Sequence, residues 1–145
     1  MTHTLPHVSL SRVTKKIGKS TILSDISLSL EEGEVFGFLG PNGAGKTTTM
    51  KAILGIIEPT SGKVEIFGKS PHDLSVKKRI GFMPENTYLY KYLTADEFLD
   101  FNGKFYDLNR EVLEIRKKEV IEKVGLAHAK NKKLNTYSKG MLQRI

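Results

Sequence analysis

The feature that most constrains this chain is a glycine-rich stretch that lies between an apolar run and a helix-forming run. Residues 40–47, Gly-Pro-Asn-Gly-Ala-Gly-Lys-Thr, match the pattern G-x-x-x-x-G-K-[ST]. The nearly continuous apolar run Val35–Leu39 precedes them and predicts a strand buried on both faces, and Thr47–Ile57 predicts a helix. Strand, loop and helix in this order are the context that this phosphate-binding pattern requires.

These residue types suit the chemistry of a bound polyphosphate. Successive backbone N–H groups converge on a phosphate only where side chains leave the turn open, and Gly40, Gly43 and Gly45 permit that turn. Lys46, also a catalytic candidate, would reach the β- and γ-phosphates, and the Thr47 hydroxyl would bind Mg²⁺. The predicted ligand is a nucleoside triphosphate with magnesium. The candidate binding residues of the loop are Gly40, Pro41, Asn42, Gly43, Ala44, Gly45, Lys46, Thr47 and Thr48.

Strand signals surround this loop. Val8–Val13 and Ile26–Leu30 alternate apolar and polar residues, as half-buried strands do. Val64–Phe67 and Ile80–Met83 are short apolar runs that predict two further strands, the second reached through a possible helix at Ser75–Arg79. The pattern predicts the α/β class, with a P-loop nucleoside-triphosphatase core and an N-terminal antiparallel β subdomain.

Helical signals dominate after about residue 93. Thr94 and Glu97 have the spacing of a capping box and predict the start of one helix. Asn109 is the predicted N-cap of a second helix, which Gly125 would end. A last helix is predicted to begin at Ser138. This part of the chain is expected to form part of a helical subdomain.

Composition excludes several other classes. The chain has 145 residues and no cysteine, which removes disulfides and thiolate metal sites. Its longest apolar stretch is about five residues, whereas a membrane-spanning helix needs roughly 20, and the opening residues do not predict a secretory signal. Residues 110–145 hold ten basic and four acidic side chains. That excess could face nucleic acid, an anionic membrane or an acidic partner, but it more often marks a solvated surface.

A second motif indicates which family of P-loop proteins the chain resembles. Tyr137-Ser138-Lys139-Gly140-Met141-Leu142-Gln143-Arg144 resembles the signature motif of ATP-binding-cassette (ABC) ATPases in its L-S-x-G-x-x-Q-R form. It lies about 90 residues after the loop lysine, as it does in that family. The Glu58–Gly62 turn and Ile80–Glu85 also fit the family pattern. The resemblance therefore covers the whole chain.

The resemblance implies a division of the chain and a set of partners. It places a β subdomain and P-loop core at about residues 1–85 and a helical subdomain at about 86–145. In the family, the serine and glycine that match Ser138 and Gly140 touch the ATP of the opposite subunit. The complete protein is thus expected to form a head-to-tail homodimer around two Mg-ATP molecules. It would lie on the cytoplasmic face of the membrane and drive transport through separate membrane-spanning subunits. The resemblance favours a bacterial exporter and disfavours nucleic acid as a partner.

The sequence departs from the family at two site positions. Glu85 stands where the family has a glutamine that contacts Mg²⁺ and the attacking water; a carboxylate can still bind magnesium. Ile17 stands where the family has an aromatic residue that stacks on adenine, and an aliphatic side chain covers a base without offering a π-face. Both positions remain candidates, Glu85 for metal binding and catalysis and Ile17 for the base.

A third departure concerns hydrolysis. The family's catalytic glutamate, magnesium-associated aspartate and switch histidine have no match up to Ile145, so this chain is expected to bind nucleotide far better than it hydrolyses it. Two alternatives stay open, a soluble ABC ATPase that acts on ribosomes or nucleic acid and a naturally short, binding-only module. Tyr88, Tyr90 and Tyr92 are expected either at a membrane-subunit interface or in the core of the helical subdomain.

Overall fold

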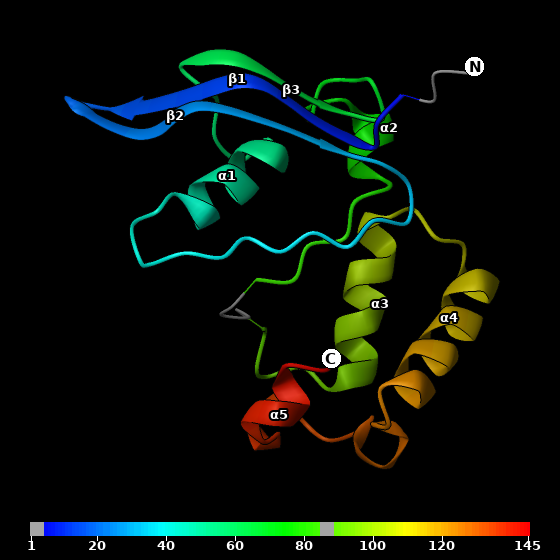
Figure 1. The fold of residues 1–145 in the computed structure, drawn as a ribbon. Helices are drawn as coiled ribbons and strands as arrows, with labels where there is room; N and C mark the ends of the chain where they lie inside the picture. The colour runs from blue at the N-terminus through cyan, green and yellow to red at the C-terminus, as the bar shows by residue number, and fades with distance from the viewer. Residues whose placement is uncertain (1–4, 85–88) are drawn as a thin grey trace. The chain divides into compact units, whose positions relative to one another are not determined.

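The computed structural model describes residues 5–84 and 89–145, which form two compact units, Met1–Ile80 and Gly81–Ile145. The first unit holds the three-stranded antiparallel sheet β2–β1–β3 (Figure 1). β1 spans Val8–Ile17, β2 spans Ser20–Leu30 and β3 spans Ser61–Ile66. The predicted antiparallel β subdomain is therefore confirmed, with two strands longer than their alternating segments. The predicted domain boundary near residue 85 stays a prediction.

Hydroxyl side chains accept hydrogen bonds from backbone N–H groups where the pairing of the strands is irregular. Arg12 and Asp25 have positive φ values of 48° and 53°, and the β1–β2 register shifts beside them. The Arg12 N–H donates to Ser27 Oγ at 3.0 Å, and the Asp25 N–H donates to Thr14 Oγ1 at 3.1 Å. These bonds satisfy backbone donors that the bulges remove from the ladder.

The first unit has a small apolar core between its sheet and helix α1. The core consists of Leu10, Val13, Leu23 and Val64, with Ile53 of α1 packed against it. α1 spans Lys46–Ile53, a shorter helix than the predicted Thr47–Ile57. Gly55 has a φ of 66° and donates its N–H to the Ala52 carbonyl, and this left-handed glycine ends the helix. A one-turn helix, α2 (Leu74–Lys77), overlaps the predicted Ser75–Arg79 region and begins one residue earlier.

Two predicted strands are wrong for this structure. Val35–Leu39 is irregular, with Val35 and Leu39 101% and 95% exposed, and Ile80–Met83 is irregular, with Met83 79% exposed. A strand needs a neighbour for its N–H and C=O groups, and neither segment pairs with a strand among residues 5–84 and 89–145. An apolar run alone therefore does not make a strand.

The second unit is helical. α3 spans Ala95–Phe105 and begins with the predicted capping box of Thr94 and Glu97, and α4 spans Arg110–Lys123 with Asn109 as its N-cap. The two helices approach closely at Gly103, where an added Cβ would lie 2.2 Å from Leu113 Cδ1. Gly125, with a φ of 69°, follows the end of α4, as predicted.

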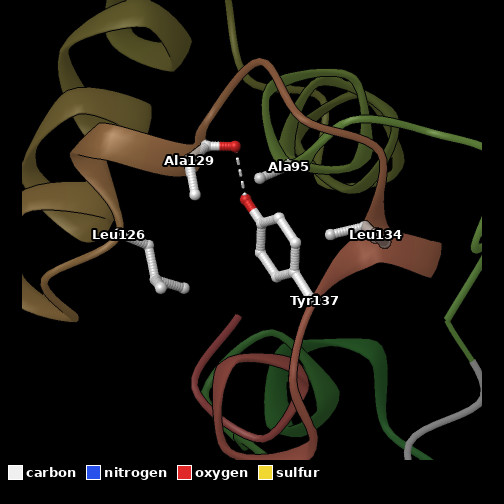
Figure 2. Close-up of a cluster of buried hydrophobic side chains, with 5 residues drawn as sticks. All are labelled: Ala95, Leu126, Ala129, Leu134 and Tyr137. Atoms are coloured by element: carbon white, nitrogen blue, oxygen red, sulfur yellow. Dashed lines mark hydrogen bonds between the residues drawn. The ribbon is translucent and has the colours of Figure 1, made fainter.

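Short helices close the second unit around its own core. The 3₁₀ turns η1 (Ala127–Ala129) and η2 (Leu134–Thr136) precede α5 (Lys139–Leu142). Figure 2 shows the buried cluster of Ala95, Leu126, Ala129, Leu134 and Tyr137. Leu126 and Leu134 are fully buried, and Met141, Leu142 and Ile145 pack against the cluster. The segment that resembles the signature motif is thus built directly onto this core.

Candidate phosphate-binding loop and signature segment

The loop of residues 40–47 takes its shape from its glycines. Gly43 and Gly45 have φ values of 86° and 90°, in the left-handed region that L side chains rarely adopt. Gly45 is also crowded, because an added Cβ would lie 2.6 Å from Leu23 Cδ2 and 3.1 Å from the Ile22 carbonyl oxygen. Gly45 is the N-cap of α1 and carries no capping side chain. The glycines therefore leave the loop backbone and the first N–H groups of α1 open.

Lys46 reaches back across the loop. Its Nζ donates to the carbonyl oxygens of Gly40 at 2.6 Å and of Pro41 at 2.7 Å. Its ammonium is therefore held against the first residues of the loop rather than extended into solvent. The first turn of α1 contains no acidic residue, so the partial positive charge of the helix N-terminus adds to the lysine charge. This arrangement concentrates positive potential at the loop.

The three consecutive threonines have different environments. Thr49 is buried, and its hydroxyl donates to the Gly45 carbonyl at 3.0 Å, so it stabilises the start of α1. Thr48 is half-buried, whereas Thr47 is exposed beside the loop. Thr47 is thus the most exposed of the three threonines, and its role as a magnesium ligand stays a prediction.

The two family departures fall in different places. Ile17 ends β1 at the β1–β2 turn, pairs with Ser20 and is 61% exposed. Its side chain is therefore available to a ligand. Glu85 lies outside the described residues, as does Tyr88.

The signature segment begins with a capped helix. Ser138 is the N-cap of α5, and its Oγ accepts a hydrogen bond from the Met141 N–H at 3.3 Å. Ser138 and Gly140 are both exposed, and a Cβ added at Gly140 would meet open space. The structure thus places the two predicted contact residues together on the surface of the second unit.

Tyr137 anchors the start of this segment. Its ring is 6% exposed, and its hydroxyl donates to the Ala129 carbonyl at 2.8 Å (Figure 2). Burial raises the pKa of the Tyr137 hydroxyl above its ordinary value. The side chain therefore remains a neutral donor inside the core.

The contacts of two cations in the second unit were not predicted from the sequence. Lys117 is 5% exposed and donates to Asp96 at 2.9 Å, Asp100 at 2.7 Å and Glu114 at 3.2 Å. Burial lowers its pKa, but the bonds to Asp100, Asp96 and Glu114 outweigh burial and raise the pKa above its ordinary value. Arg144 donates to two backbone carbonyls. Of the three Lys117 contacts, only the one with Glu114 has a local i, i+3 spacing in the sequence, because Asp96 and Asp100 lie on α3.

Aromatic residues form a row along the second unit. The ring centroids of Tyr90 and Phe101 are 5.2 Å apart, and those of Phe101 and Phe105 are 4.9 Å apart, both edge-to-face. Tyr90 and Tyr92 are 59% and 84% exposed. Tyr90 therefore packs on a helix of its own unit and still presents surface, so both expectations for these tyrosines stay open.

Among residues 5–84 and 89–145, no group of three or more histidine or acidic side chains is placed to hold a metal ion. Within the same residues, no helix combines the length and the apolar character needed to cross a membrane.

The loop, its lysine and the following helix define the class of P-loop nucleotide-binding proteins. A family model described as ABC transporter matches residues 18–145. The chain therefore belongs to the ABC transporter family, a membership that implies ATP binding. Its fold also matches a solved structure of the ATP-binding subunit of an ABC transporter, with a TM-score of 0.82 and 28% identity. The match covers 94% of this chain and 58% of that one.

Relatives with similar sequences belong to the same family. The chain is 46% identical over 125 residues to the uncharacterized ABC transporter ATP-binding protein sll0415 of Synechocystis, which covers 85% of this chain and 35% of that protein. It is 43% identical over 135 residues to the linearmycin resistance ATP-binding protein LnrL of Bacillus subtilis, covering 92% and 43% respectively. The chain thus spans less than half the length of these relatives.

Proposed function

We propose that this chain is the nucleotide-binding part of an ABC transporter ATPase and that residues 40–48 bind Mg-ATP. The observation that carries the proposal is the position of Lys46 against Gly40 and Pro41, beside open glycine backbone. A cation, oriented N–H groups and a helix N-terminus there would all stabilise the β- and γ-phosphates. Magnesium would neutralise phosphate charge, and Thr47 would hold it, with Glu85 as a second ligand and Ile17 covering the base.

The signature segment has a separate role in this proposal. Ser138 and Gly140 would contact the γ-phosphate of ATP bound to a second subunit in a head-to-tail dimer. The support is their exposure together at the start of α5, together with the family resemblance of residues 137–144. Each subunit would then complete its partner's site and leave its own unchanged.

We further propose that dimer closure moves separate membrane-spanning subunits and that hydrolysis resets it. The protein would lie on the cytoplasmic face of the membrane through those subunits. The exposed rings of Tyr90 and Tyr92 would suit such an interface. The resistance function in the name of LnrL supports export as the direction of transport.

The experiment is a binding titration with Mg-ATP by isothermal calorimetry. We expect Lys46→Ala to abolish measurable binding, because the loop then loses its only side-chain cation. Lys51→Ala is the matched control, since Lys51 is an exposed lysine in the last turn of the same helix. Circular dichroism would verify that both variants are folded. Equal affinity of Lys46→Ala and the wild type would overturn the assignment of this loop.

A further inference from the structure

Arg144 connects the signature segment to a different helix of the same unit. Its Nη1 donates to the Val124 carbonyl at 3.0 Å, and its Nε donates to the Gly140 carbonyl at 3.2 Å. Val124 and Arg144 are twenty residues apart in sequence. One guanidinium thus joins the end of α4 to the first turn of α5.

The Val124 carbonyl is a suitable acceptor for physical reasons. Val124 is the C-cap of α4, and the last four carbonyls of a helix lack partners within it. Gly125 turns the chain away with a φ of 69°, and a Cβ added there would lie 3.7 Å from Arg144 Nη1. A cation at this end also complements the negative end of the helix dipole. The guanidinium therefore occupies a position that α4 itself favours.

We propose that Arg144 is a positioning residue that sets the orientation of α5, and with it Ser138 and Gly140, from the C-terminal end of α4. This inference rests on the proposed function for the role of Ser138 and Gly140 toward a second subunit. Tyr137 fixes the start of the segment to Ala129, and Arg144 fixes its other end to Val124. A displacement of α4 is consequently passed to residues 138–142.

The guanidinium shape matters for this role. Nε and Nη1 point along different directions of one rigid plane, so a single side chain can bond two carbonyls at once. A lysine ammonium on a flexible stem would hold one of the two carbonyls. Glutamine retains a donor but loses the charge. The strength of the link between α4 and α5 should therefore decrease from arginine to lysine to glutamine at position 144.

The test is amide hydrogen exchange by NMR on the 145-residue chain. In Arg144→Gln we expect exchange of the Leu142 and Gln143 amides, which bond to Ser138 and Lys139, to rise about three- to tenfold. Arg144→Lys should give an intermediate rise. Exchange in α3 should stay as in the wild type. Arg116→Gln is the matched control, because Arg116 is an exposed arginine of α4 that bonds only Glu119 among the described residues.

The outcomes separate this inference from the proposed function. Wild-type exchange in Arg144→Gln, or an equal rise across α3, α4 and α5, would overturn the positioning role, the second by showing a general loss of stability. Mg-ATP binding is measured on the same samples. Absence of Mg-ATP binding by the wild-type chain would overturn the proposed function. Faster exchange confined to α5 in Arg144→Gln would still support the positioning role of Arg144. We expect Arg144→Gln to bind Mg-ATP with wild-type affinity, because the loop belongs to the first unit.

Discussion

The loop of residues 40–47 and the segment of residues 137–144 each present backbone N–H groups at the start of a helix, but they hold their shapes differently. The loop depends on its own backbone, with left-handed glycines at positions 43 and 45. The segment depends on side chains that reach elsewhere, Tyr137 to Ala129 and Arg144 to Val124. Gly140 lacks a positive φ.

This difference predicts where each region is sensitive to mutation. A loop whose backbone conformation is set by its own glycines should lose that conformation when the glycines are replaced, and should keep it when a distant core is mutated. A segment held by tertiary contacts fails when its core is damaged. The following changes can break or confirm this distinction.

Leu126→Ala should have the largest effect, because Leu126 is fully buried in the core beneath the segment. The cavity should cost about 2–5 kcal/mol of the free energy of unfolding of the second unit. Thermal denaturation would measure it, and Mg-ATP affinity should not change. Ile115→Ala, at a position of α4 that is 60% exposed, serves as the control and should be nearly neutral. Loss of ATP binding in folded Leu126→Ala would contradict the independence of the loop.

Gly45→Ala should have the next largest effect, which should fall on Mg-ATP binding by the loop. The φ of 90° and the 2.6 Å approach of Leu23 Cδ2 both oppose a side chain there. Strain of about 1–3 kcal/mol would weaken Mg-ATP binding by roughly five- to 150-fold in a calorimetric titration. Gly81→Ala is the control, because its φ is not positive and an added Cβ meets nothing within 4 Å. Unchanged affinity in Gly45→Ala would show that the loop tolerates the strain.

Alkaline pH should have the smallest effect. The raised pKa of Tyr137 means that the folded state keeps a proton that the unfolded state releases, so stability is intact below pH about 10 and falls above it. Urea denaturation at several pH values would measure this loss. In Tyr137→Phe the hydroxyl bond to Ala129 is absent at every pH, which should cost about 1 kcal/mol, and this part of the pH dependence should disappear. An equal loss of stability at alkaline pH in the wild type and in Tyr137→Phe would show that groups other than Tyr137 cause it.

Local signals in the sequence predicted much of this structure. Thr94, Asn109 and Ser138 cap helices as expected, because a cap depends on a few neighbouring residues. The strand expected at Val35–Leu39 did not form, because a strand depends on a neighbour that its own residues do not supply. The loop was recognisable for the same reason as the caps, since its pattern is contiguous.

The tertiary contacts of the candidate site could not be predicted in this way. No motif marks Lys117, and the signature motif names Arg144 without its contact to Val124. The acceptors on other elements become neighbours of these cations only after folding. The crowding of Gly45 by Leu23 is also invisible in the loop pattern itself. The chemical groups of the candidate site are therefore evident in the sequence, whereas the contacts that hold them in place are not.

The contact between Gly45 and β2 also has a consequence for the order of folding. β1 and β2 form a hairpin of local contacts, and hairpins form within about 1–10 μs. During synthesis, chains grow at about 5–20 residues per second, so Leu30 leaves the ribosome before residue 40 does, by a time far longer than hairpin formation takes. Leu23 and Ile22 thus belong to a strand pair that has time to form before Gly45 emerges. Position 45 must therefore be glycine from the moment the loop first packs against the hairpin.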